Sequence, residues 1–268
     1  MRLDDVKGFV LDIDGTLVHR AGEEVHVQPG AREVLAGIRA SGRRFVLFTN
    51  GSHAPPEIFA EGLRAAGLPV ADDELLTPLD SVQSYLRGHH RDDAVLLFGT
   101  DSARSYLIRA GVRIVDEDAT RADAVFVAHP EVVDFTELER AARAVLAGAP
   151  LLTGSYAPAY AGANGPIFSR GAMLTAALAK ATGTRPVIVG KPSRAVLQTI
   201  RERLGLPSKQ LAVIGDDLGM DIALGRLGGA RTILVRSGIS SDVELEQVPV
   251  RHRPDAIVDG VAELLDWL

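Results

Sequence analysis

The chain has no cysteine among its 268 residues, which excludes disulfide bonds, thiolate metal sites and a cysteine nucleophile. Long hydrophobic runs are also missing, because apolar stretches such as 45–48 and 187–189 fall far short of the roughly 20 residues of a membrane helix. The start carries acidic residues where a signal peptide needs an apolar segment. With 29 basic and 35 acidic residues the net charge is −6, so nothing favours nucleic acid or an anionic membrane as a partner. We therefore expect a cytoplasmic protein, although the absence of cysteine alone would also permit export.

Short apolar runs alternate with longer amphipathic stretches from end to end. The 46% hydrophobic and 24% charged residues are ordinary for a globular protein, and the length suits one large domain or a core with a smaller second unit. Strand–helix alternation predicts an α/β fold whose mostly parallel sheet is covered by helices on both faces. We expect strands at 8–13, 44–49, 95–98, 124–128, 211–214, 232–235 and 256–258, and helices at 31–40, at 57–66, after Asp134 and up to Leu204.

The domain organisation has two interpretations. Motifs that carry chemistry gather near residues 12–16, 49–52 and 190–221, whereas the stretch from about Asp80 to about Gly183 has strands and helices but no comparable motif. One interpretation is a second α/β domain inserted into the first, with the chain returning to the core near Pro186. The alternative is one continuous large sheet.

The most informative segment is an apolar strand that runs directly into Asp12 and Asp14, followed by Gly15 and Thr16. The carboxyl end of a parallel strand borders the crevice where open α/β sheets bind ligands. Two clustered carboxylates can hold a hard cation such as Mg²⁺, and a carboxylate can also attack phosphorus to form an aspartyl-phosphate. The alternative is a strand end with solvated acids.

Three further segments offer complementary groups. Thr49-Asn50-Gly51-Ser52 follows another apolar strand and can hold phosphate oxygens, although these residues also make ordinary turns. Lys191 stands before a proline-fixed helix start and can place a cation over a phosphate or a carboxylate, unless it is a surface lysine. Asp216 follows a further strand, where it can complete a metal site with Asp12, and Asp221 lies in the next helix; the alternative is a helix start enriched in acids by the helix dipole. Together the four segments hold the groups that phosphoryl transfer needs.

These motifs, in this order, resemble the four motifs of the haloacid dehalogenase superfamily, and more narrowly its NagD-type, p-nitrophenylphosphatase-like branch. The resemblance covers nearly the whole chain and is carried by residues 12–17, 29–31, 48–52, 76–78, 190–193, 214–222 and 232–238. It implies a Rossmann-like catalytic core formed by residues 1–79 and 184–268, with an inserted α/β cap domain at residues 80–183.

The resemblance also implies an activity, a Mg²⁺-dependent phosphatase that hydrolyses a small organic phosphate monoester. Asp12 would be the nucleophile that carries the phosphoryl group, and Asp14 the general acid and base. The other implied roles are phosphate binding by Thr49, Asn50 and Lys191, and Mg²⁺ binding by Asp12, the backbone carbonyl of Asp14, and Asp216, with support from Asp221.

The chain departs from the branch at three places. Gly51 replaces the second of two asparagines, Met220 stands where a small or hydroxyl residue is common and could crowd Asp221, and 153–156 lacks the amide and acid of a Thr-Asn-x-Asp motif. The stretch 153–170 is rich in glycine, alanine, proline and aromatic residues, and is either a plain surface connection or the part of the cap that selects the leaving group. Its expected contacts are Tyr156, Tyr160, Asn164 and Arg170.

Two other functions use the same residues. A phosphotransferase or phosphomutase would pass the aspartyl-phosphate to a sugar hydroxyl, and a non-catalytic phosphate-binding protein would keep only the acidic pocket. Asp14 argues against the latter, because a phosphorylated receiver has no need of an acid two residues beyond its aspartate. Similar proteins use phosphoglycolate, glycerol phosphate, pyridoxal phosphate, sugar phosphates or nucleoside monophosphates, and the resemblance also suggests a homodimer formed through the cap.

Overall fold

The strands that end in the acidic motifs lie side by side in the computed structural model, which describes residues 3–21, 24–90, 92–116, 119–160 and 167–268. They belong to a six-stranded parallel sheet in the order β15-β14-β13-β1-β4-β5. Its strands are β1 (Gly8–Leu11), β4 (Arg44–Phe48), β5 (Leu75–Leu76), β13 (Leu211–Gly215), β14 (Arg231–Val235) and β15 (Ala256–Val258). Leu11 is in register with both Ile214 of β13 and Leu47 of β4, so these three strands end at one edge.

Helices cover both faces of this first sheet. One face packs against α1 (Ala31–Ala40), α2 (Pro56–Ala65) and the C-terminal 3-10 helix η6 (Val261–Trp267), and the other against α7 (Arg194–Leu204) and α8 (Ala223–Gly228). Alternation along β1 explains this, because Phe9 and Leu11 enter the first cluster and Val10 enters the second. Short helical turns complete the connections: η1 (Asp72–Glu74), η2 (Ser208–Gln210), the π-helical η3 (Leu218–Ile222), η4 (Leu245–Gln247) and η5 (Val250–His252).

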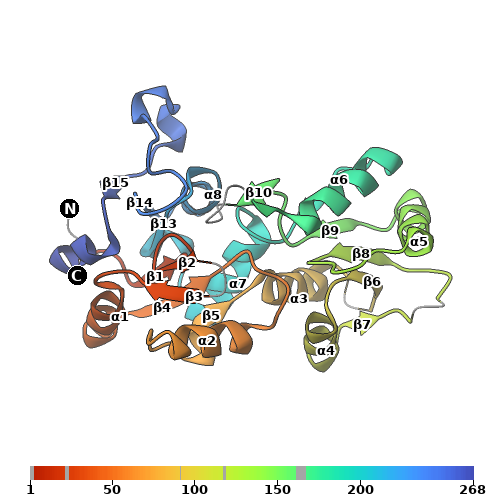
Figure 1. Cartoon of the computed structure of the whole chain (residues 1–268), viewed down its shortest axis with the longest axis horizontal. Helices are drawn as coiled ribbons and strands as arrows, with labels where there is room; N and C mark the ends of the chain where they lie inside the picture. Colours follow the sequence, from red (N-terminus) through yellow and green to blue (C-terminus); the bar gives the residue numbers. More distant parts are fainter. Residues whose placement is uncertain (1–2, 22–23, 91, 117–118, 161–166) are drawn as a thin grey trace.

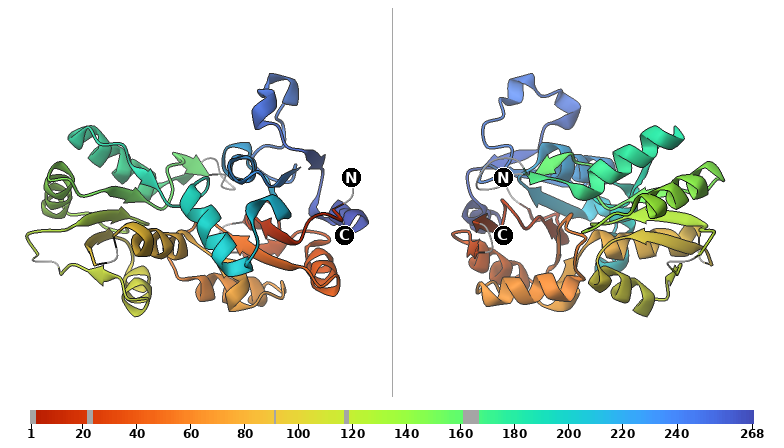
Figure 2. Two further views of the ribbon diagram at one scale, coloured as in Figure 1. Left: turned by 180° about the vertical axis from the view of Figure 1, so that it is seen from behind. Right: turned by 45° about the vertical axis from the view of Figure 1, so that its right-hand side comes forward.

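A second, five-stranded parallel sheet has the order β12-β9-β8-β6-β7. Its strands are β6 (Ala94–Phe98), β7 (Arg113–Ile114), β8 (Ala124–Val127), β9 (Leu151–Thr153) and β12 (Val187–Ile188). One face packs against α3 (Pro78–His89) and α4 (Asp101–Arg109), and the other against α5 (Phe135–Leu146) and α6 (Arg170–Thr182). The two sheets lie along the long axis of the molecule with α3 and α7 between them, and both termini are at the far end of the first sheet (Figures 1 and 2).

Two antiparallel hairpins stand outside the sheets. The hairpin of β2 (Val18–Ala21) and β3 (Glu24–Val27) directly follows the first acidic motif, and β10 (Ala159–Tyr160) pairs with β11 (Ile167–Phe168). Among the described residues, no helix is long and apolar enough to cross a membrane.

The predicted α/β class with parallel sheets flanked by helices is confirmed, whereas one continuous sheet, the alternative, is wrong. Each expected strand is present with ends shifted by a few residues at most, and the Asp134 side chain accepts a hydrogen bond from Thr136 N at 3.0 Å to cap α5. The apolar run before Lys191 is a surprise, because Val187 and Ile188 pair with Leu152 and Thr153 of the second sheet.

Candidate active site

Asp12 leaves β1 at the common edge of the three motif strands, where its backbone N–H donates to the carbonyl of Ile214 at 2.9 Å. A tight turn follows, in which Gly15 has φ of +89° and its N–H donates to the carbonyl of Val18 at 2.8 Å. This left-handed conformation favours glycine. The turn buries Thr16, whose hydroxyl donates to Asp12 Oδ2 at 3.3 Å, so the carboxylate is held at the sheet edge.

Lys191 lies at the centre of the site. Its Nζ is 2.5 Å from Asp12 Oδ1 and 2.7 Å from Asp221 Oδ1, and it donates to the carbonyl of Phe48 at 2.9 Å. Only 4% of the Lys191 side chain is exposed. Burial alone lowers the pKa of Lys191, but the charges of the two carboxylates outweigh it and raise that pKa above its ordinary value. The ammonium is therefore a fixed positive charge rather than the surface lysine that was the alternative.

Asn50, in the loop after β4, holds the backbone of Lys191 in place. Its side-chain carbonyl accepts from Lys191 N at 2.8 Å, and its amide nitrogen donates to the carbonyl of Lys191 at 3.1 Å. The same nitrogen approaches the sulfur of Met220 at 3.6 Å. Met220 therefore does not displace Asp221, which keeps its contact with Lys191. Phosphate binding by Asn50 stays a prediction, since the amide is engaged with the backbone on both of its ends.

Three carboxylates gather beside the lysine. Asp12, Asp216 and Asp221 each offer an oxygen within 4.8 Å of the others. Burial, followed by the charges of neighbouring aspartates, raises the pKa of Asp12 well above its usual range despite the opposing charge of Lys191. Burial and the charge of Asp221 raise the pKa of Asp216 to about 7. Crowded carboxylate oxygens are the ligands that hard divalent cations prefer, so the donor set fits Mg²⁺.

The loop after β14, at residues 237–240, closes over Asp216, and the sequence motifs gave it no role. Ile239 N donates to Asp216 Oδ2 at 2.7 Å, and a side-chain carbon at Gly238 would overlap that oxygen. Ser237 donates to the carbonyl of Gly15 at 2.6 Å, and Ser240 accepts from Leu218 N at 3.2 Å. The Ser-Gly pair shortly after the strand at 231–235 was the available signal, because glycine there permits the close approach.

Asp14 lies apart from the buried cluster. Its side chain is 45% exposed, and Asp14 Oδ1 is 2.5 Å from Arg20 Nε on β2. The hairpin that follows the motif therefore places a guanidinium against this carboxylate. Thr49 directly follows β4 and is buried, and its hydroxyl accepts a hydrogen bond from Gly51 N at 3.0 Å.

The expected cap contacts are only partly described. Tyr156 is 39% exposed, whereas the side chain of Tyr160 and all of Asn164 lie outside the described residues. The hydroxyl of Thr153 donates to the carbonyl of Ser155 at 2.8 Å, within its own loop. The contacts of these residues with a leaving group stay predictions.

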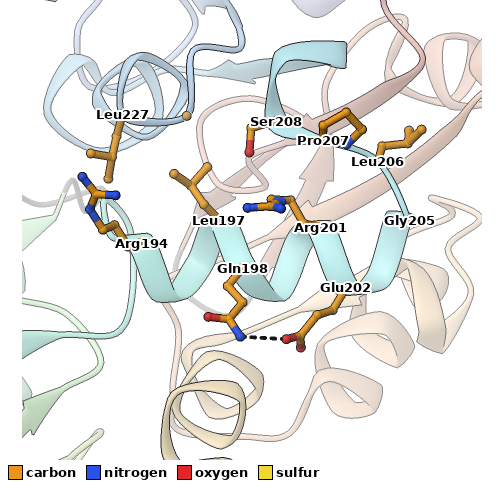
Figure 3. A pocket seen from close by; sticks show the side chains of 11 residues that line it. Arg194, Leu197, Gln198, Arg201, Glu202, Gly205, Leu206, Pro207, Ser208 and Leu227 are labelled. Atoms are coloured by element: carbon orange, nitrogen blue, oxygen red, sulfur yellow. Dashed lines mark hydrogen bonds between the residues drawn. The ribbon is translucent and has the colours of Figure 1, made fainter. Parts of the chain in front are cut away.

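An open groove of about 830 Å³ runs along the outer side of α7 (Figure 3). Arg194, Leu197 and Arg201 point into it, and Gln198 donates to Glu202 at 2.9 Å on its rim. None of its lining residues belongs to the cluster around Lys191. The edge of the first sheet, where buried charges converge, is therefore the candidate active site.

Comparisons with known proteins show what the chain is similar to. Residues 9–113 match a family described as haloacid dehalogenase-like hydrolase, and residues 188–264 match one described as HAD-hydrolase-like. The ribonucleotide monophosphatase NagD of Escherichia coli (strain K12) is 30% identical over 97% of this chain and 98% of its own length. The dihydroxyacetone phosphatase of Corynebacterium glutamicum (strain R) is 26% identical over 96% of this chain and 90% of its own. The structure of the 4-nitrophenylphosphatase from Thermotoga maritima has a TM-score of 0.87 and 26% identity, and the match covers 98% of each chain.

Proposed function

We propose, because this chain belongs to the haloacid dehalogenase-like hydrolases, that it is a phosphatase which cleaves small phosphate monoesters through a phosphoryl group carried on Asp12. The observation that carries the proposal is the placement of the Asp12 carboxylate. It stands at the carboxyl edge of the sheet, fixed by Thr16 on one oxygen and by Lys191 on the other. A nucleophile held in this way needs no rearrangement before it attacks.

Two displacements at phosphorus complete the reaction. In the first, an oxygen of Asp12 bonds to phosphorus, the bond to the ester oxygen breaks, and Asp14 gives its proton to the leaving alcohol. In the second, Asp14 takes a proton from water, whose oxygen bonds to phosphorus while the bond to Asp12 breaks. Inorganic phosphate leaves and both carboxyl groups return to their starting states. The 45% exposure of Asp14 leaves its carboxylate accessible to an alcohol or to water.

The phosphate would be bound by groups of fixed position. Lys191 Nζ offsets negative charge as it builds on the phosphate oxygens, and the Thr49 hydroxyl can turn its proton toward one of them. Asn50 acts on the same charge by holding the backbone on both sides of Lys191.

The metal we propose is Mg²⁺, held by the carboxylates of Asp12 and Asp216 and the backbone carbonyl of Asp14, with Asp221 in support. When bound, it supplies positive charge against the phosphate oxygens. The contact of Ile239 N with Asp216 fixes one carboxylate of this site in orientation.

We further propose that the second sheet and its helices, predicted at residues 80–183, form a cap domain inserted between the two halves of the catalytic core, with the chain returning to the core after β12 at Ile188 rather than at residue 184. The second sheet supports this, because the chain passes from β5 of the first sheet through α3 to the second sheet, and returns after β12 directly before Lys191. Selection of the leaving group by Tyr156, Tyr160 and Asn164, pairing of two copies through the cap, and cytoplasmic residence remain predictions from the sequence.

A phosphate-release screen tests the function. The enzyme is incubated with a panel of phosphate monoesters, with Mg²⁺ and with a chelator, and the Asp12→Asn variant serves as the control. We expect release from several esters with Mg²⁺, and loss of release with the chelator or the variant. Failure to release phosphate from any ester in Mg²⁺ would overturn the proposal.

A further inference from the structure

Two histidines from different sheets face one another beside the active site. His53 follows Thr49 in the loop after β4, and His129 follows β8 of the second sheet. Their ring centroids are 5.6 Å apart with an interplanar angle of 63°. The imidazole of His53 also packs edge-on against the Phe59 ring of α2, with centroids 4.8 Å apart. Phe59 therefore supports the His53 ring of this pair from α2.

The loop that carries His53 is shaped for this contact. A side-chain carbon at Gly51 would come 2.7 Å from the ring of Phe59, so Phe59 fills the space that an asparagine at position 51 would need. On the other side, the hydroxyl of Thr100 at the start of α4 donates to the carbonyl of His53 at 2.6 Å. Glycine at position 51 therefore leaves room for the ring of Phe59, which packs against the imidazole of His53.

The pair lies beside the candidate site, because His53 belongs to the loop that begins at Thr49, at the edge of the first sheet. The charges of Arg20 and Asp14 act on His53, and those of Arg170 and Glu131 act on His129. Asp14 is the proposed donor of the proton to the leaving alcohol, so groups around its carboxyl face that alcohol. Within the described part of the chain, no group hydrogen-bonds the ring nitrogens of either histidine, so these nitrogens are free for a ligand.

Charges of both signs act on the two histidines. Burial lowers the pKa of both His53 and His129, and the positive charges of Arg20 and Arg170 lower them further. The imidazoles are therefore neutral at pH 7, and each offers one hydrogen-bond donor and one acceptor. Arg20 is paired with Asp14, with 2.5 Å between Nε and Oδ1, and the charge of Glu131 opposes that of Arg170 at His129. Such a surface suits hydroxyl groups, which donate and accept, better than a second anionic group.

Resting on the proposed function, we propose that His53 and His129 are specificity-determining residues that hydrogen-bond the hydroxyl groups of an uncharged polyol or sugar leaving group. The core then binds the phosphate of any ester, and the pair of histidines distinguishes the alcohols. A leaving group without hydroxyls gains nothing from the two imidazoles.

The test compares kcat/KM for three esters: glycerol 3-phosphate, 3-phosphoglycerate, which adds a carboxylate, and p-nitrophenyl phosphate, which has no hydroxyl. The variants His53→Phe and His129→Phe keep a ring for packing but remove the hydrogen bonds, and His53→Gln restores a donor and an acceptor. His89→Phe is the matched control, because His89 stacks on Tyr85 of α3 with ring centroids 4.5 Å apart.

We expect each Phe variant at 53 or 129 to lower the ratio of kcat/KM for glycerol 3-phosphate over p-nitrophenyl phosphate by about five- to tenfold, the effect of one neutral hydrogen bond. His53→Gln should recover part of the ratio, and His89→Phe should keep the wild-type value. Equal changes for all three esters, or a loss confined to 3-phosphoglycerate, would overturn the inference. Failure of the proposed function itself is distinguishable, since the wild type would then release phosphate from none of the esters.

Discussion

Replacement of Lys191 by methionine tests the electrostatic design of the site most severely. Methionine fills a similar volume but removes the charge that lies 2.5 Å from Asp12 and 2.7 Å from Asp221. Removal of one partner of a buried ion pair costs about 3–5 kcal/mol, because the remaining charge is buried without compensation. Two carboxylates are left here, in a site where only 4% of the lysine side chain was exposed, so we expect a loss in the upper part of that range.

The loss should be visible in thermal unfolding and in turnover. For 268 residues the entropy of unfolding is about 0.56 kcal/mol/K, so 3–5 kcal/mol corresponds to a fall in Tm of about 5–9 °C. The fall should shrink as the pH is lowered, because the carboxyl of Asp12, whose pKa burial already raises, then takes a proton and loses its charge. Phosphate turnover should fall by at least about 10³-fold, equivalent to about 4 kcal/mol of barrier.

The matched control is Lys209→Met, which removes an exposed lysine of η2 and should leave both measurements unchanged. Lys191→Arg should recover stability better than turnover, because the planar guanidinium keeps the charge but does not fit the space of the compact ammonium. A Lys191→Met enzyme with wild-type Tm and turnover would refute the reasoning, since the lysine would then be dispensable to both the fold and the reaction.

Three further results follow from the same geometry. Asp216→Ala should weaken Mg²⁺ binding and turnover together, with part of the rate recovered in excess Mg²⁺; isothermal titration checks this, and unchanged affinity would exclude Asp216 as a ligand. Because the pKa of Asp216 is raised to about 7, the metal-free site holds a proton below that pH, so the apparent Mg²⁺ affinity should rise by up to about tenfold per pH unit between pH 5 and 7. A Mg²⁺ affinity that stays the same from pH 5 to pH 8 would contradict this. Thr49→Ala should lower kcat/KM for all phosphate esters by a similar factor, whereas Tyr156→Ala should affect them unequally if the cap selects the alcohol; kinetics over an ester panel separates the two.

Most of the fold could be predicted from the sequence because its signals are local. The strands at 8–11 and 44–48 are short apolar runs bounded by polar turns, and α1 begins and ends where its apolar spacing predicts. The apolar run at 187–188 was harder, because the periodicity of a buried strand does not say which sheet it joins. The second sheet takes it through pairing with β9, a contact that only the tertiary arrangement reveals.

The candidate site likewise contains residues that could be predicted from the sequence and contacts that could not. Asp12, Asp216 and Lys191 could be found because each sits at a strand end or helix start in a recognisable motif, and the structure brings them together. The support of Asp216 by the backbone of Ile239 was harder to find, because a backbone N–H leaves no trace in residue type and the neighbouring Gly238 is an indirect signal. His53 likewise has no motif of its own, and its position depends on a contact with a residue 76 positions away in the chain.

The central claim is that the phosphoryl group passes through Asp12. Reaction of the enzyme with p-nitrophenyl phosphate is stopped with acid during turnover, the protein is reduced with borohydride, which converts an aspartyl-phosphate to homoserine, and the peptides are analysed by mass spectrometry. The account predicts homoserine at position 12 in the wild type, more of it in Asp14→Asn, which lacks the base for the second step, and none in Asp12→Asn. Full turnover of substrate with unmodified aspartate at position 12, or with homoserine at another aspartate, would contradict it.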